Sequence, residues 1–141
     1  QLLIYGDGDQ KKNLLEIAQE YNLQEQVKFL GIENNHAKIF GNADCLLLNS
    51  KYESFGRVII EALSYGCKII SVNCPVGPKE ILKNGFFGDL YEPGDVKKLT
   101  HLMVNAIQNQ YKQKTYSEKE LDTHLQLFQP SKILKDYMIN L

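Results

Sequence analysis

The stretch Lys51–Gly66, "KYESFGRVIIEALSYG", decides how the rest of the chain is interpreted. It sets two glutamates eight positions apart, with Glu53 just before an expected helix and Glu61 in its middle. On that helix Glu61 shares a narrow polar stripe with Arg57 and Ser64, because residues three or four apart are neighbours. The other side is apolar and carries Val58, Ile59, Ala62 and Leu63. Spacing alone leaves two interpretations open: an exposed Arg57–Glu61 ion pair worth about a few tenths of a kcal/mol, or a ligand site.

The residues before this helix favour a ligand site. The four apolar residues Cys45–Leu48 are typical of a strand buried on both faces of a parallel sheet. Such sheets bind ligands at the carboxyl ends of their strands, where the loop 49–56 begins. Free backbone N–H groups at a helix start can bind anionic oxygens, and Gly56 lets a ligand approach closely. The Glu53 carboxylate can accept two hydrogen bonds from adjacent sugar hydroxyls.

Short apolar runs and helical periods alternate along the chain. The expected strands are Leu2–Tyr5, Val27–Leu30, Cys45–Leu48, Lys68–Val72 and Phe86–Tyr91. The first expected helices are Gln10–Tyr21, Asn35–Asn42 and the helix of the opening motif, which ends at about Tyr65 with Gly66 as its left-handed cap. A short helix from Pro78 to about Gly85 follows, and Asp95 caps the next one. The last two are a helix opened by the capping box "SEKE" at Ser117 and the helix Ser131–Asn140. This alternation predicts an α/β fold with a Rossmann-like, doubly wound parallel sheet.

The composition restricts the classes of partner. The chain has 141 residues and a formal net charge of −1, so no overall charge attracts nucleic acid or an anionic membrane. Its three cysteines lack metal-site spacing and are expected to be reduced and mostly buried. No apolar run reaches the length of a membrane span, and no signal peptide is visible. Because the chain opens on Gln1 inside an expected strand, we expect it to be a piece of a longer protein.

The sequence "YGDGDQKK" raises an NAD-binding alternative. Gly6 and Gly8 lie between an expected strand and an expected helix, as in a dinucleotide fingerprint. The fingerprint needs a third glycine at position 11, which is Lys11, and Glu25 is a poor candidate for the acidic residue that should follow. The alternative is a tight turn with a positive φ at glycine.

Five segments together resemble a known family. "ESFGRVIIE" is similar to the E-x7-E motif of retaining glycosyltransferases of family 4, which have the GT-B fold. "LLIYGDG", "VKFLG", "ADCLLLNS", "SKYESFGRVIIEALSYG" and "GPKEILKNGFFGDLYEPGD" follow the order of motifs in the nucleotide-binding domain of that family. The resemblance covers about residues 2–110, and five motifs in register are far more specific than one.

The resemblance implies a role for each matching residue. Glu53 would contact hydroxyls of the donor sugar at the catalytic centre, and Glu61 would bind the ribose. The backbone amides of Phe55 and Gly56 would face the sugar and the diphosphate. Arg57 would begin the helix that points at the phosphates. The full donor- and nucleotide-binding set implied is Ser54, Phe55, Gly56, Arg57, Val58, Glu61, Ile32, Glu33, Lys38 and Gly6, with Ile32, Glu33 and Lys38 near the base. His36, His101 and His124 are expected to be surface or packing residues.

The resemblance also implies an organisation and a reaction. Residues 1–110 would form a Rossmann-like donor-binding domain, and residues 111–141 would form C-terminal helices packing on it. The N-terminal acceptor domain would be absent, so the isolated chain is expected to be inactive. The enzyme would be a hexosyl- or N-acetylhexosaminyltransferase that uses a nucleotide-sugar, with a UDP-sugar expected, and retains the anomeric configuration. The acceptor would be a glycan, a lipid-linked sugar or a lipopolysaccharide-type molecule.

The expected partners therefore include the donor, the acceptor and the N-terminal domain, but no nucleic acid, cofactor or metal. The expected location is the cytoplasm, and peripheral docking on the inner membrane face stays open. The alternatives are a non-catalytic nucleotide-binding module of the same fold and, third, an NAD-binding domain.

Overall fold

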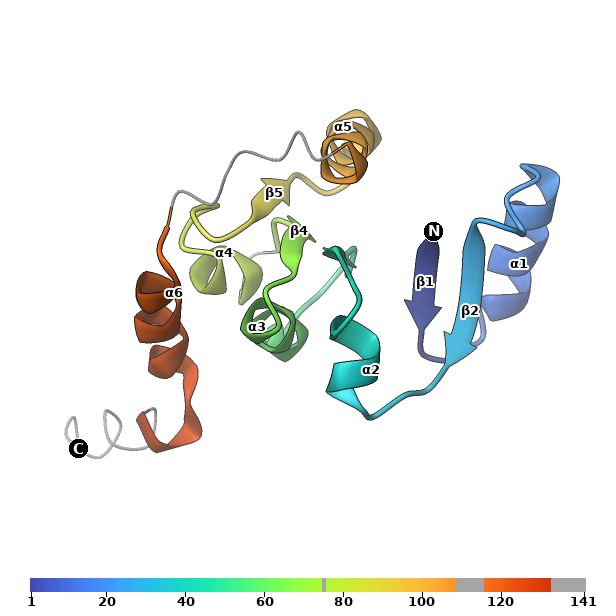
Figure 1. Ribbon diagram of the computed structural model, residues 1–141. Coiled ribbons are helices and arrows are strands. Elements are labelled where there is room, and N and C mark those ends of the chain that lie inside the picture. The colour runs from blue at the N-terminus through green and yellow to red at the C-terminus, as the bar shows by residue number, and fades with distance from the viewer. Residues whose placement is uncertain (75, 109–115, 133–141) are drawn as a thin grey trace. The chain divides into compact units, whose positions relative to one another are not determined.

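The computed structural model describes residues 1–74, 76–108 and 116–132, which form two compact units (Figure 1). The first unit is Gln1–Asn42 and the second is Ala43–Leu141. Each unit has a parallel sheet with helices between its strands, so the predicted α/β fold with parallel strands is confirmed. The strands lie in two sheets, ordered β1-β2 and β3-β4-β5. The predicted division into residues 1–110 and 111–141 stays a prediction.

The first unit follows the order strand, helix, strand, helix. It consists of β1 (Leu2–Tyr5), α1 (Lys11–Glu20), β2 (Val27–Gly31) and α2 (His36–Phe40). Parallel pairing sets Leu2 opposite Val27, and the Gly6 amide donates to the Gly31 carbonyl over 2.7 Å. Gly6 has a φ of 121°, which is the positive value that the sequence predicted for this turn.

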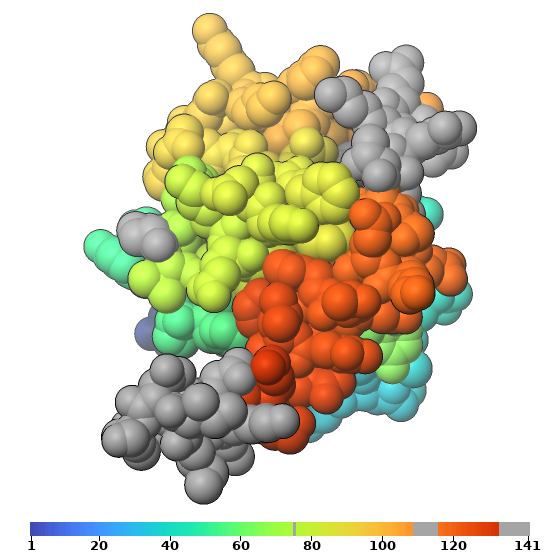
Figure 2. Space-filling view, turned by 90° about the vertical axis from the view of Figure 1, so that its left-hand side faces the viewer, coloured from blue at the N-terminus to red at the C-terminus, as the bar shows by residue number. Residues whose placement is uncertain are grey.

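The second unit carries the loops of the opening motif. Its strands are β3 (Cys45–Leu48), β4 (Lys68–Val72) and β5 (Asp89–Tyr91). Its helices are α3 (Arg57–Ser64), α4 (Pro78–Ile81), α5 (Val96–Ile107), α6 (Glu118–Leu125) and the 3₁₀ turn η1 (Gln126–Phe128). In Figure 1, α3 and α5 lie on different sides of β4, as a doubly wound fold requires. Figure 2 shows α6 and η1, in orange and red, covering one face of this unit.

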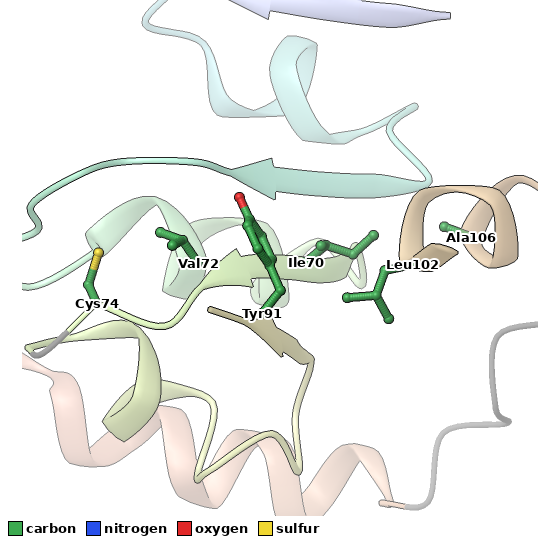
Figure 3. Packing of buried hydrophobic residues seen from close by; sticks show 6 residues of the cluster. All are labelled: Ile70, Val72, Cys74, Tyr91, Leu102 and Ala106. Atoms are coloured by element: carbon green, nitrogen blue, oxygen red, sulfur yellow. The ribbon is translucent and has the colours of Figure 1, made fainter. Parts of the chain in front are cut away.

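Strand β4 is the centre of the core. Four of its five residues are buried, because β3 and β5 flank it and helices cover both faces. Ile70 and Val72 pack with Tyr91 and with Leu102 and Ala106 of α5 (Figure 3). Alternate residues of a strand face opposite sides, which places Ile69 and Ser71 toward the other layer.

Local signals predicted the caps and most boundaries. Gly66 has a φ of 78°, Asp95 accepts a hydrogen bond from the amide of Lys98, and Ser117 forms a reciprocal capping box with Glu120. These three predictions are confirmed. The predicted terminal helix Ser131–Asn140 lies almost entirely outside the described residues.

Two predictions about strands were wrong. The predicted strand Phe86–Tyr91 is only Asp89–Tyr91, because the residues before it turn: Lys83, Asn84 and Gly85 all have positive φ. Strand β3 was expected to be buried on both faces but is half-buried, since it is an edge of its three-stranded sheet.

The cysteines confirm the prediction of reduced, mostly buried thiols. All three are free, with Cys67 and Cys74 buried and Cys45 half-buried. Burial raises the pKa of the Cys45 thiol to about 11, with a smaller contribution from Cys67 nearby. Cys67 Sγ donates to the Ala43 carbonyl over 3.3 Å, so this thiol has a partner in the core.

Gly88 permits the close packing of the turn before β5, and replacing it should destabilise the fold. A Cβ at Gly88 would lie 2.8 Å from Ile69 Cβ and 3.0 Å from Leu82 Cδ2. We expect Gly88→Ala to lower the free energy of unfolding by about 1–3 kcal/mol through overpacking. Gly8→Ala is the control, because a Cβ there meets nothing within 4 Å. Urea denaturation of both variants checks this, and equal stabilities would contradict it.

Candidate functional site

Two loops begin at the same edge of the β3-β4-β5 sheet. The loop 49–56 follows β3, and a second loop, of which the structure describes residues 73, 74, 76 and 77, follows β4, at the carboxyl ends of parallel strands. The Tyr91 hydroxyl donates to Asn49 Oδ1 over 2.7 Å, and Cys74 Sγ donates to the Ser50 carbonyl over 3.2 Å. The start of the first loop is therefore bonded to residues of β5 and of the second loop.

The two loops meet at the backbone of Phe55 and Gly77. A Cβ on Gly77 would lie only 2.3 Å from the Phe55 carbonyl oxygen and 2.7 Å from the Phe55 carbonyl carbon. Gly77 also has a φ of 91°, a conformation that side chains disfavour. The site therefore depends on a glycine at this position for both space and conformation.

The amino end of α3 lies directly after this contact. Gly56 is the N-cap with a φ of 84° and contributes no capping side chain. The first amides of a helix lack intrahelical acceptors and carry the positive end of the helix dipole. The amino end that begins at Arg57 and Val58 can therefore bind an anion, with Ser54 exposed and Phe55 half-buried just before it.

Glu53 lies in the same loop and is half-buried. Within the part of the chain that the structure describes, its carboxylate makes no hydrogen bond or ion pair. A carboxylate removed in part from water favours hydrogen bonds that replace the lost hydration. Glu53 is therefore available to a ligand with hydroxyl donors.

Asn73 is a polar residue that the sequence analysis missed. Its Nδ2 donates to Glu92 Oε1 over 2.8 Å, whereas its Oδ1 is buried and has no partner among the described residues. Its position in the sequence could have identified it as a candidate, because it is the first residue after the central strand β4. Polar residues at that position of a parallel sheet lie at the ligand edge.

Glu61 and Arg57 form the contact that the spacing suggested. Arg57 Nη2 lies 3.9 Å from Glu61 Oε1, and the side chains are 82% and 25% exposed. The Ser64 hydroxyl donates to the Glu61 backbone carbonyl over 2.7 Å. Because the guanidinium is largely in water, the ion pair is worth only tenths of a kcal/mol, roughly.

The residues expected near the base lie in the first unit. Glu33 Oε1 accepts from the amides of Asn34 and Asn35 over 2.9 and 2.8 Å, and Lys38 Nζ lies 3.4 Å from Glu33 Oε2. The Asn35 hydrogen bond, aided by Lys38, lowers the pKa of Glu33. Ile32 directly follows β2, and Gly6 is paired with Gly31. The structure thus brings Glu33 and Lys38 together within the first unit.

Neither a metal centre nor a membrane helix is found among the described residues. Across positions 1–74, 76–108 and 116–132, no group of three His, Cys, Asp or Glu residues could hold a metal ion. Over the same positions, every helix is too short or too polar to cross a bilayer.

Comparison with known proteins identifies the family to which the chain belongs. Residues 1–122 match the family described as "Glycosyl transferases group 1". The chain is 28% identical over 137 residues to the N-acetyl-alpha-D-glucosaminyl L-malate synthase of Bacillus anthracis, covering 97% of this chain and 36% of that protein.

Two solved structures are similar to the chain. The lipopolysaccharide outer core galactosyltransferase WaaB, in its apo form, superposes with a TM-score of 0.81 and 26% identity, over 97% of this chain and 39% of that one. Anabaena Alr3699/HepE in complex with UDP superposes with a TM-score of 0.82 and 26% identity, over 99% of this chain and 40% of that one. The chain therefore spans about two fifths of the length of these proteins.

The Phe55–Gly77 contact should make Gly77 far less tolerant of substitution than other glycines with a positive φ. Gly77→Ala and Gly66→Ala both introduce a side chain at positive φ, which costs about 1–2 kcal/mol. Only at Gly77 would the new Cβ also overlap backbone atoms, since Gly66 has nothing within 4 Å. We expect Gly77→Ala to lower the free energy of unfolding by at least about 1 kcal/mol more than Gly66→Ala. Urea denaturation compares them, and equal losses would contradict the contact.

Proposed function

The chain belongs to the group 1 glycosyl transferases, and on that premise we propose that it is the donor-binding part of an enzyme that transfers a sugar from a nucleotide-sugar. One observation carries the proposal. Glu53 is half-buried, is unpaired among the described residues and lies in the loop before the amino end of α3, which has no side-chain cap. A group that can accept hydrogen bonds from hydroxyls thus lies in the loop that leads to free helix-start amides, which can bind an anion, and a sugar diphosphate presents both chemistries.

Each part of a nucleotide-sugar has a complementary group in this proposal. Glu53 holds the donor-sugar hydroxyls, and the amides of Phe55 and Gly56 bind the diphosphate. Glu61 accepts from the ribose hydroxyls. As the bond to the sugar breaks, negative charge grows on the diphosphate, and fixed amides with Arg57 stabilise it. Ser54 belongs to the same loop, and Val58 belongs to the first turn of α3.

We propose UDP as the nucleotide and retention as the stereochemical outcome. The UDP complex of HepE and its complex with UDP and glucose support the choice of UDP, because this chain is similar to that protein. The base-binding role of Ile32, Glu33 and Lys38, and the place of Gly6 in the site, stay predictions. Transfer without a metal ion also stays a prediction, tested by adding a chelator to the assay.

The acceptor and the chemistry of the whole protein belong to the proposal as well. We propose a glycan, lipid-linked or lipopolysaccharide-type acceptor, since the names of similar proteins include a lipopolysaccharide galactosyltransferase. The transferred group would be a hexosyl or N-acetylhexosaminyl unit. The acceptor would bind an N-terminal domain of the same protein, so this chain alone should not turn over. We also propose action in the cytoplasm, and docking on the inner membrane face stays open.

Calorimetric titration of the full protein tests donor binding. UDP and UDP-sugars should bind more tightly than GDP, ADP and NAD. Hydrolysis of the bound UDP-sugar in the absence of acceptor should release a sugar of the donor's anomeric configuration, observed by NMR. Binding without any sugar release, with or without acceptors, would favour the non-catalytic module, and a preference for NAD would favour the third alternative.

Replacing Glu61 should weaken nucleotide binding. Glu61→Gln removes the charge that strengthens hydrogen bonds to the ribose, so we expect the Kd for UDP to rise about tenfold or more. Glu118→Gln is the matched control, because Glu118 is an exposed glutamate on α6 and takes no part in the site. Calorimetry measures both constants, and an unchanged Kd for Glu61→Gln would remove the ribose role.

A further inference from the structure

The segment α6–η1 is bonded to the end of α4. His124 Nε2 lies 2.8 Å from the carbonyl oxygen of Ile81, the last residue of α4. Carbonyls at a helix end lack intrahelical partners, and a carbonyl only accepts, so Nε2 carries the hydrogen. The His124 ring also stacks on Phe87, with centroids 4.6 Å apart and planes at 24°. His124 therefore fixes α6 to α4 and to the turn that follows it.

The same segment reaches the loop 49–56. The Phe128 ring of η1 meets the Phe55 ring edge to face, with centroids 5.8 Å apart and planes at 63°. The His124 ring meets Phe128 in the same manner, at 5.1 Å and 81°. Edge-to-face pairs have a preferred geometry, so they restrict how each ring is oriented. Phe87, His124, Phe128 and Phe55 thus form a continuous row of rings, which we call the aromatic row.

The aromatic row ends at the contact on which the site depends. Phe55 carries the carbonyl that lies against Gly77, and α4 begins at Pro78, the next residue after Gly77. Phe128 therefore holds one side of the Phe55–Gly77 contact, and His124 holds α4 on the other side. Figure 2 shows α6 and η1 lying against the yellow-green surface around α4.

We propose that Phe128 and His124 are positioning residues for the donor. Through the Phe55 ring they hold the loop 49–56 so that the amides of Phe55 and Gly56 face the diphosphate. They touch neither substrate nor reacting atoms. This proposal rests on the donor-binding function proposed above, and it assigns the C-terminal segment a role in affinity as well as in packing.

Matched leucine substitutions test the proposal in the full protein. Phe128→Leu removes the ring that meets Phe55, and we expect the Kd for a UDP-sugar to rise about fivefold. Phe86→Leu is the control, because Phe86 lies outside the aromatic row and its ring contacts Phe87 and Tyr116, not Phe55. It should lower Tm and leave the Kd within about twofold. Phe128→Tyr keeps the ring and should keep the Kd.

A double-mutant cycle separates positioning from packing. If Phe128 acts through the Phe55 ring, Phe128→Leu should have little further effect on the Kd in a Phe55→Leu background. A Phe128→Leu protein that loses stability but binds as tightly as wild type overturns the proposal, as do fully additive effects in the cycle.

His124 provides a second variant if Phe128→Leu does not fold. His124→Gln retains a donor for the Ile81 carbonyl but interrupts the aromatic row, so the Kd should again rise, and an unchanged Kd would overturn the proposal. A wild-type protein that binds no nucleotide-sugar is a different outcome, because it contradicts the proposed function itself.

Discussion

The backbone of Gly77 lies against the backbone of Phe55, with no space for a Cβ between them. This contact joins the loops that leave β3 and β4, and two helices start from it. Helix α4 begins at Pro78, whose fixed φ suits a first helical position. Helix α3 begins directly after Gly56, and it is Gly56 that has the left-handed conformation. Because both loops are fixed at one point, the free amides of α3 have a defined direction, which the proposed binding of a diphosphate requires.

The core is connected to the start of the loop 49–56 through Tyr91. Its ring is buried with Ile70 and Val72 (Figure 3). Its hydroxyl donates to Asn49 Oδ1 at the start of the first loop. Burial raises the pKa of Tyr91, so the hydroxyl keeps its proton and remains a donor at neutral and moderately alkaline pH. One side chain therefore contributes apolar area to the core and orients a loop of the site.

Local patterns in the sequence predicted elements, whereas contacts between distant segments could not be predicted. The strands Cys45–Leu48 and Lys68–Val72 and the caps at Asp95 and Ser117 follow from residues within a few positions of each other. The bond from His124 to Ile81 joins residues 43 positions apart, and neither residue type signals its partner. Periodicity shows which face of a helix is apolar, but it does not show what covers that face.

The weak Arg57–Glu61 pair bears on how charge would be arranged if the proposed donor binds. At 3.9 Å and with the guanidinium 82% exposed, breaking the pair costs about a few tenths of a kcal/mol. A hydrogen bond from the guanidinium to a phosphate contributes more, about 1.5–3 kcal/mol, because both groups are charged. In the proposed function, an Arg57 side chain that turned to the phosphates would therefore gain more than it gives up at Glu61, whose side chain is 25% exposed.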